Sequence, residues 1–285
     1  REIDEENMTA TVQAGVVTAN LQAEVEKRGL LYPPDPASIK QSTIGGNVAC
    51  NAGGPRCLKY GVTSNYVLGL TVVLADGRLV RTGGKAIKYV TGFNMNQFFV
   101  GSEGALGIIT EVILRLICKP PYARTALVHF PALEDAGRSV HAVLARGLVP
   151  AALELLDETA IECIEEAMQL GLPLDVEAIL VIESDGADEE SVQREVDAIA
   201  DVCLETGASR VDVARDEEER AELWRARRSI SPSLAPKAPN KLGDDITVPR
   251  SGIAEAVRRI KAISARYGLP IVVFGHAGDG NLHPN

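Results

Sequence analysis

Two histidines near the end of the sequence have the side chains best suited to chemistry. His276 and His283 lie in a segment with three glycines, which directly follows an apolar run at 271–274. We expect this run to be a buried strand that presents both imidazoles at its end. Because the two histidines are seven positions apart, only a loop that folds back would bring them together.

Three roles are open to this pair of histidines. Two neutral imidazoles with a carboxylate would form a site for a divalent metal such as Zn²⁺ or Mn²⁺. One imidazole could instead serve as a general base. The spacing alone favours a third interpretation, two surface histidines beside a turn, because it matches no standard zinc signature.

Three arginines lie close together on a predicted helix at 217–234. Arg225, Arg227 and Arg228 have glutamates at 218, 219 and 222 as helical neighbours. A solvated face of ion pairs accounts for at least two of these arginines. A guanidinium is also a planar fork of N–H groups that matches the shape of a carboxylate. Both roles remain open at this point.

A glycine-rich segment at 42–55 is the third feature with chemical potential. It holds two glycine pairs, Gly45-Gly46 and Gly53-Gly54, separated by small residues. Such a bare backbone can lie against a flat or anionic group and donate N–H bonds to it. The segment is neither a Walker loop nor a dinucleotide fingerprint. Tight turns in a packed sheet are the alternative interpretation of each pair.

Two parts of the chain must position these residues. Residues 1–118 carry 11 Lys and Arg against 10 Asp and Glu, whereas residues 119–285 carry 18 against 29. Thirteen of the 26 glycines lie within 41–110. Lys119-Pro120-Pro121 is a natural boundary. We therefore expect two domains, 1–118 and 119–285.

Hydrophobic periodicity predicts the elements of each part. In the first part we expect strands at 9–15, 67–75, 78–82 and 108–117, helices at 17–28 and 94–100, and a loop at 43–61. In the second part strands at 125–130, 152–156, 178–183, 210–214, 246–248 and 271–274 alternate with helices at 133–146, 158–170, 189–206, 217–234 and 253–267. A parallel sheet and an antiparallel sheet with helices on one face both fit this alternation.

The composition bounds the class of protein. The chain has 285 residues, is 46% hydrophobic and carries a net charge of −10, which argues against disorder and against a nucleic-acid partner. No apolar run approaches the roughly 20 residues of a membrane-spanning helix. Five cysteines, an odd number, do not form a disulfide framework, so we expect a cytoplasmic setting. Cys118, Cys163 and Cys203 are predicted to be packed thiols.

The motifs resemble a known family when they are taken in order along the chain. The series is Pro34-Asp35-Pro36, the glycine segment from Thr43 to Gly54, Tyr60-Gly61-x-Thr63, Asp76-Gly77, and Gly101-Ser102-Glu103-Gly104-x-Leu106-Gly107-Ile108-Ile109-Thr110. It resembles the FAD-binding domain of the vanillyl-alcohol oxidase / p-cresol methylhydroxylase superfamily. Within that superfamily it is most similar to the D-2-hydroxyacid dehydrogenase branch, which includes the flavin subunit of bacterial glycolate oxidase and D-lactate dehydrogenases.

The resemblance implies an α+β fold. The second half of a p-cresol-methylhydroxylase-type FAD-binding domain would be followed by an FAD-linked oxidase C-terminal domain, an antiparallel sheet with helices. It also implies that the chain is a fragment that lacks an N-terminal FAD subdomain and a C-terminal end. FAD would be bound without a covalent link, since no histidine precedes His129. The residues implied to contact FAD are Pro34, Asp35, Thr43, Gly45, Gly46, Asn47, Asn51, Gly53, Gly54, Gly61, Thr63, Gly107, Ile108 and Ile109.

For the second part, the resemblance implies an active site. His276 and His283 would hold a divalent metal, Zn²⁺ or Mn²⁺, and Arg227 would bind the substrate carboxylate. Ser231, Lys241 and Asn281 are further substrate-contact candidates.

The implied reaction is oxidation of a small 2-hydroxy acid, glycolate or D-lactate, to the 2-oxo acid by hydride transfer to flavin N5. An electron-accepting subunit or a quinone would take the electrons, and partner subunits could place the cytoplasmic protein at a membrane. The alternatives are a non-catalytic FAD-binding subunit and an inactive fragment.

Overall fold

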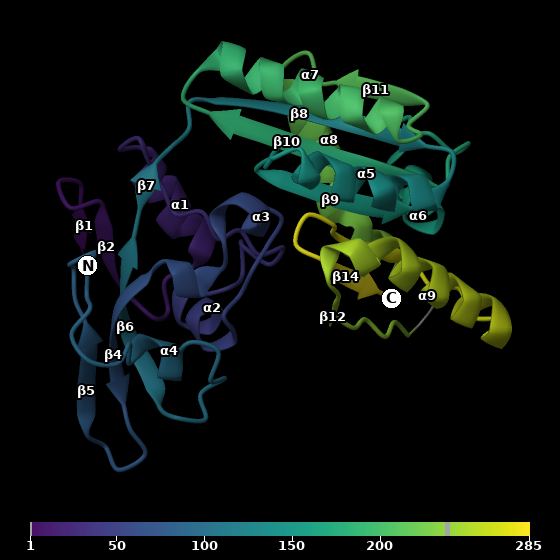
Figure 1. The fold of residues 1–285 in the computed structure, drawn as a ribbon. Helices are drawn as coiled ribbons and strands as arrows, with labels where there is room; N and C mark the ends of the chain where they lie inside the picture. Colours follow the sequence, from purple (N-terminus) through teal and green to yellow (C-terminus); the bar gives the residue numbers. More distant parts are fainter. Residues whose placement is uncertain (1, 237–239) are drawn as a thin grey trace. The chain divides into compact units, whose positions relative to one another are not determined.

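The fold was analysed in a computed structural model, which describes residues 2–236 and 240–285. The chain forms two compact units, unit 1 (Arg1–Lys119) and unit 2 (Pro120–Asn285) (Figure 1). Each unit is built on its own antiparallel sheet. The α+β fold implied by the sequence is therefore confirmed, and the parallel alternative considered for the second part is wrong.

Unit 1 contains a five-stranded sheet. Across it lie β1 (Glu2–Asp4), β2 (Thr9–Gln13), β6 (Ile108–Arg115), β4 (Val67–Val73) and β5 (Leu79–Gly83). A separate ladder joins β3 (Leu30–Leu31) to β7 (Ile117–Cys118). The helices are α1 (Thr18–Glu26), α2 (Ile44–Cys50), α3 (Cys57–Tyr60) and α4 (Asn96–Phe99), with a 3₁₀ turn at Thr63–Asn65. Asp76-Gly77 turns the β4–β5 hairpin, with Gly77 at φ 84°.

The prediction of a loop across 43–61 is wrong, because α2 and α3 form there. Thr43 caps α2 by accepting a bond from the Gly46 N–H, and Asn51 ends the helix in the left-handed conformation. Ile44 and Val48, one turn apart, are both fully buried. The glycines concealed this helical period because their intrinsic helix propensity is low.

Unit 2 contains a seven-stranded sheet whose neighbours are all antiparallel. In order across it lie β11 (Arg210–Val213), β8 (Tyr122–Phe130), β10 (Ala178–Gly186), β9 (Ala152–Asp157), β13 (Val273–His276), β14 (Asn281–Pro284) and β12 (Ile246–Thr247). The helices are α5 (Leu133–Ala145), α6 (Glu158–Met168), α7 (Glu189–Glu205), α8 (Glu217–Ser233) and α9 (Ile253–Tyr267), with a 3₁₀ turn at Arg250–Gly252.

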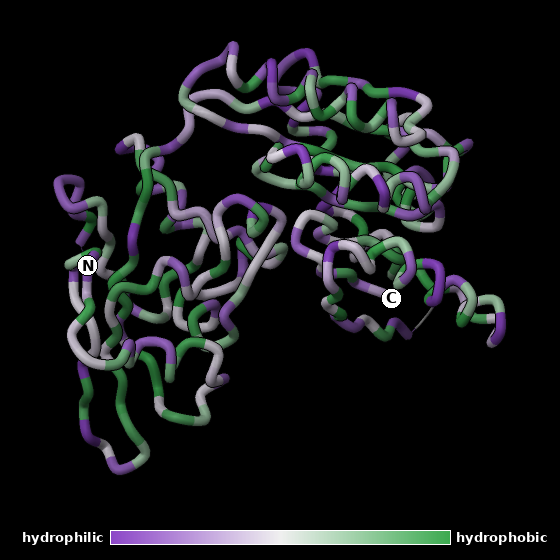
Figure 2. The backbone as a smooth tube through the Cα atoms, viewed as in Figure 1, coloured by the Kyte–Doolittle hydropathy of each residue, from purple (hydrophilic) through white to green (hydrophobic). Residues whose placement is uncertain are grey.

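Helices cover both faces of the unit 2 sheet, whereas the antiparallel alternative placed them on one face (Figure 1). α6 and α8 form a core with one face, which includes Leu156, Ile179 and Val181. α5 and α7 pack on the other face, and α9 contacts α5. Along the helices, hydrophilic and hydrophobic residues alternate (Figure 2), as expected of helices with one buried stripe. Within the described parts of the chain, no helix has both the length and the apolarity that a membrane crossing requires.

The cysteines differ in accessibility. Cys163 and Cys203 are buried, whereas Cys50 and Cys118 are exposed, so the prediction that Cys118 is a packed thiol is wrong. Cys118 is the last residue of the short edge strand β7, where nothing covers it fully. Burial raises the pKa of the Cys203 thiol to about 12.

We expect iodoacetamide at pH 8 to alkylate Cys50 and Cys118 in the folded protein and to leave Cys203 unmodified, because the thiolate is the reactive form. Peptide mass spectrometry locates the adducts, and the control is the same reaction in denaturant, where all five cysteines should react. Rapid alkylation of Cys203 before unfolding would contradict the described core.

Candidate active site

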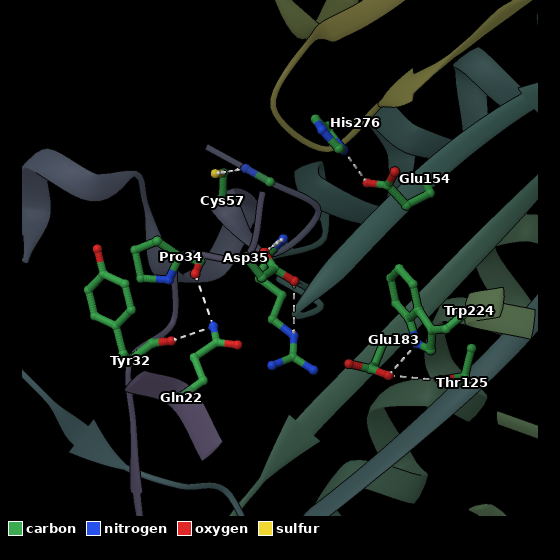
Figure 3. Close-up of polar contacts among 12 residues, drawn as sticks. Gln22, Tyr32, Pro34, Asp35, Cys57, Thr125, Glu154, Glu183, Trp224 and His276 are labelled. Carbon is green, nitrogen blue, oxygen red and sulfur yellow. Dashed lines mark hydrogen bonds and ion pairs between the residues drawn. The ribbon is translucent and has the colours of Figure 1, made fainter. Parts of the chain in front are cut away.

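A buried carboxylate on β9 joins two of the predicted site residues. The Oε2 atom of Glu154 accepts a bond of 2.6 Å from Arg227 Nε and lies 2.6 Å from Arg227 Nη2. Its Oε1 atom lies 2.7 Å from His276 Nδ1 (Figure 3). Glu154 is 0% exposed and Arg227 is 7% exposed. The structure thus brings Arg227 and His276 together through a single side chain.

Strand periodicity explains this meeting. Glu154 and His276 are directly opposite each other in the β9–β13 ladder, and residues two apart on a strand share a face. Glu154 therefore faces the same side as Leu156, which packs against α6 and α8. α8 buries Arg227 on that side, while Arg225 on the same helix is exposed and pairs with Glu222.

His283 reaches the same place through the β13–β14 hairpin. The hairpin pairs Phe274 with His283 and His276 with Asn281, so both imidazoles lie on one face. Their ring centroids are 5.0 Å apart, with the rings nearly perpendicular. His283 Nδ1 contacts the carboxylate of Asp245, just before β12. β14 was absent from the predicted elements, because Asn-Leu-His-Pro contains no run of strand-forming residues.

The two histidines have opposite electrostatic surroundings. Burial by itself lowers the pKa of His276, but the charge and hydrogen bond of Glu154 outweigh it and raise the pKa above its ordinary value. The same contacts, together with Arg227, overcome burial and lower the pKa of Glu154. Burial lowers the pKa of His283 in spite of Asp245. At neutral pH the neutral form is therefore favoured at His283.

The imidazoles fit part of a metal site. Each has its Nδ1 atom held by a carboxylate, Glu154 or Asp245, which leaves Nε2 as the ligand atom. Histidine ligands of metals are usually held this way. Among residues 2–236 and 240–285, however, no three His, Cys, Asp or Glu side chains come together in a group that could hold a metal. The described residues therefore bring two imidazoles together and form no complete metal site.

The remaining substrate-contact candidates lie at two places in unit 2. Lys241 Nζ donates a bond of 2.7 Å to Ser231 Oγ, and both residues are exposed. Asn281, opposite His276, has a buried Oδ1 atom with no hydrogen-bond partner in the described part of the chain. A buried acceptor without a donor is costly, which makes this oxygen suited to a ligand hydroxyl.

A second buried carboxylate also anchors α8. Glu183 on β10 is 0% exposed and accepts bonds from Trp224 Nε1 at 2.6 Å and Thr125 Oγ1 at 3.1 Å (Figure 3). Arg220 Nη1 donates to the same oxygen at 3.1 Å. The sequence analysis singled out neither Glu183 nor Glu154. The available signal was a lone glutamate inside an apolar strand, since charged residues are rarely buried without partners.

In unit 1, the first backbone N–H groups of α2 form hydrogen bonds with acceptors in the same unit. The N–H groups of Ile44 and Gly45 bond to the carbonyls of Val16 and Ala14, each at 2.8 Å, and the Gly46 N–H bonds to Thr43 Oγ1. These donors are therefore engaged within the unit. Gly46 itself is exposed and has only Thr43 Oγ1 near its missing side chain, so its bare surface remains open to a flat group.

Several residues implied to contact FAD have inward-facing side chains. Asn47 is buried and donates to Thr18 Oγ1 at 2.7 Å, and Thr63 donates to the Ala52 carbonyl at 2.7 Å. The Pro34 carbonyl accepts from Gln22 (Figure 3), and Asn51 Oδ1 accepts from the Ser64 N–H. Structural roles thus account for the side chains of Asn47, Thr63 and Asn51 and for the Pro34 carbonyl, and any FAD contact would use their remaining surface.

The glycines of this group also pack closely. A Cβ atom on Gly45 would meet Ala14 Cβ at 2.5 Å, and one on Gly54 would collide with the Asp35 carbonyl. A Cβ atom on Gly53 would lie 3.0 Å from Cys57 Sγ. Cβ atoms on Gly61 and Gly107 would collide with Asn65 and Val72. Ile108 is exposed and Ile109 is half-buried. Close packing explains most of these glycines with or without FAD.

Comparison with known families identifies the class of protein. The family described as "FAD linked oxidases, C-terminal domain" matches residues 119–285, and the family described as "FAD binding domain" matches residues 1–83. The chain belongs to the FAD-linked oxidases.

Individual relatives narrow the comparison. The chain is 49% identical over 283 residues to "Glycolate oxidase subunit GlcD" of Bacillus subtilis, covering 99% of this chain and 60% of the relative. It is 40% identical to the protein of the same name from Escherichia coli (96% and 55% covered) and 37% identical to "D-lactate dehydrogenase" of Anaerostipes hadrus (98% and 60% covered). The chain thus spans little more than half the length of these relatives.

Solved structures share the fold. p-Cresol methylhydroxylase with substrate bound has a TM-score of 0.78 at 17% identity, over 99% of this chain and 62% of that one. 4-Ethylphenol oxidase from Gulosibacter chungangensis has a TM-score of 0.76 at 21% identity, with the same coverage. The fold is therefore of the p-cresol-methylhydroxylase type, as the sequence implied.

We expect Gly54→Ala to destabilise unit 1 by about 1–3 kcal/mol, the usual cost of overpacking, because the new methyl group collides with the Asp35 carbonyl. The control is Gly15→Ala, where no atom lies within 4 Å of the added Cβ. Urea unfolding monitored by circular dichroism measures both. Equal midpoints for the two variants would contradict the close approach of Gly54 to Asp35.

Proposed function

We propose that this protein oxidises a small 2-hydroxy acid, glycolate or D-lactate, to the corresponding 2-oxo acid, with FAD as the acceptor of the electrons. The observation that carries the proposal is the assembly of Arg227, His276 and His283 on one face of the unit 2 sheet. A domain that only bound FAD would not need a buried arginine and two imidazoles at one place. The printed names of the relatives support the same substrate class.

Arg227 is suited to bind the substrate carboxylate. Its Nε and Nη2 atoms face Glu154, and its guanidinium carbon lies 5.0 Å from the centre of the Phe274 ring. The Nη1 side of the guanidinium takes no part in the contact with Glu154. We assign this side to the substrate, with a charge-assisted hydrogen bond as the main contact.

The imidazoles and Asn281 would surround the substrate oxygens. We propose that His276 and His283 hold a divalent metal, Zn²⁺ or Mn²⁺, through their Nε2 atoms, with a further ligand from outside the described set. Such a metal supplies positive charge that lowers the pKa of a bound hydroxyl. The buried Oδ1 atom of Asn281 would accept the hydroxyl hydrogen bond. Ser231 and Lys241 would contribute at the exposed end of α8.

The reaction requires that the substrate lose a hydride from its α-carbon and a proton from its hydroxyl, and the proton would pass to a general base outside the described residues. FAD supplies the hydride acceptor when it is bound. We propose a non-covalent FAD, because the described residues of unit 1 include no histidine that could form a link. Electrons would then pass to a further subunit or to a quinone, in keeping with relatives that are named as subunits. The protein would be cytoplasmic and would reach a membrane surface through partner subunits.

The test of this function is dye reduction by the FAD-loaded protein. We expect glycolate or D-lactate to reduce an electron-accepting dye, and the variant carrying His276→Ala and His283→Ala to retain FAD absorbance while losing turnover. If no D-2-hydroxy acid reduces the dye, the proposed function is wrong. Turnover that survives both substitutions would remove the histidines from the mechanism.

Arg227→Lys should raise KM for the 2-hydroxy acid about 10- to 100-fold, the value of one charge-assisted hydrogen bond, because lysine lacks the planar fork. The matched control is Arg225→Lys on the same helix, which changes an exposed ion pair with Glu222 and should leave KM unchanged. Steady-state kinetics distinguishes them. An unaltered KM in Arg227→Lys would show that the substrate carboxylate binds elsewhere.

A further inference from the structure

We infer that Glu154 is the positioning residue of this site: one buried carboxylate orients both the Arg227 guanidinium and the His276 imidazole, so that carboxylate binding and metal binding depend on the same side chain. The inference rests on the proposed function for the identity of the two ligands. The geometry that supports it is formed entirely by described residues of this chain.

Glu154 determines which side of Arg227 is available. A guanidinium is planar, so fixing its Nε–Nη2 edge also fixes the direction in which the Nη1 side points. Glu154 Oε2 holds that edge with two contacts of 2.6 Å. The Phe274 ring, 5.0 Å from the guanidinium carbon, restricts rotation out of the plane. Arg227 is therefore held both at one edge and on one face.

Glu154 also determines which nitrogen of His276 is available. Its Oε1 atom lies 2.7 Å from Nδ1, so Nδ1 donates to the carboxylate and Nε2 is the nitrogen left to bind a metal in the neutral imidazole. A carboxylate behind a metal-ligating histidine sets both the tautomer and the ring orientation. Each oxygen of Glu154 thus serves a different functional group.

Burial makes Glu154 hard to replace. At 0% exposure, no solvent can take over its hydrogen bonds if the carboxylate is removed. The equivalent partner of His283 is different, because the Asp245 side chain is 71% exposed and water can substitute for it. The orientation of His276 therefore depends on its carboxylate more strongly than that of His283.

The chain provides a matched control for this argument. Glu183 is also 0% exposed and also ties α8 to the sheet, through Trp224 and Arg220. Neither Arg227 nor His276 is among its hydrogen-bond partners in the described structure. A substitution at Glu183 therefore reports the cost of weakening the helix anchor without altering the two site groups directly.

The experiment compares Glu154→Gln with Glu183→Gln in the FAD-loaded protein. Calorimetry measures the dissociation constant of Zn²⁺, and the flavin absorption spectrum measures that of oxalate, an analogue that is not oxidised. We expect Glu154→Gln to weaken both ligands at least tenfold, the lower limit for loss of a carboxylate behind a metal ligand. Glu183→Gln should lower the melting temperature and leave both constants within twofold of wild type.

Three outcomes would overturn the inference: Glu154→Gln binds both ligands within twofold of wild type, Glu183→Gln weakens both as strongly, or the wild-type protein binds neither. If Glu154→Gln does not fold, Glu154→Asp decides instead. It keeps the charge but is one methylene too short to reach both partners, so at least one constant should rise, and two unchanged constants refute the inference. Neither binding measurement requires turnover, so failure of the inference is distinguishable from failure of the proposed function.

Discussion

The arrangement of unit 2 depends on the ion pairs of one buried carboxylate. A charge removed from water is tolerated only when it is paired and hydrogen-bonded. Glu154 meets this requirement with Arg227 on one oxygen and His276 on the other. Removing one partner of such a pair usually costs about 3–5 kcal/mol. Glu154 therefore links β9 to both β13 and α8, and these contacts fix the positions of Arg227 and His276.

The surrounding fold makes that contact possible. Strand alternation points Glu154, His276 and Glu183 toward the face that α8 covers, and Glu183 fastens the same helix through Trp224. The hairpin between β13 and β14 adds His283 to this face. Two buried glutamates thus hold the helix in place, while only Glu154 touches the residues assigned to chemistry.

Local patterns in the sequence predicted the helices of unit 2 and its strands apart from β14, and they singled out His276 and Arg227 as candidates, because each depends on a short periodic segment or motif. Glu154 could not be predicted in the same way, since its partners lie 73 and 122 positions away and meet it only through strand register. The α2 helix was hidden by glycines, although Thr43 was a recognisable cap. Whether helices cover one face or both is likewise decided by tertiary packing.

A crystal structure of the FAD-loaded protein with Zn²⁺ and oxalate is the decisive test of whether Glu154 holds Arg227 and His276 at once. We expect Glu154 to lie between the Arg227 Nε–Nη2 edge and His276 Nδ1, with oxalate at the Nη1 side of the guanidinium and Zn²⁺ at Nε2 of His276. A structure in which Glu154 leaves either partner, or in which oxalate occupies the Nε–Nη2 edge, would contradict it.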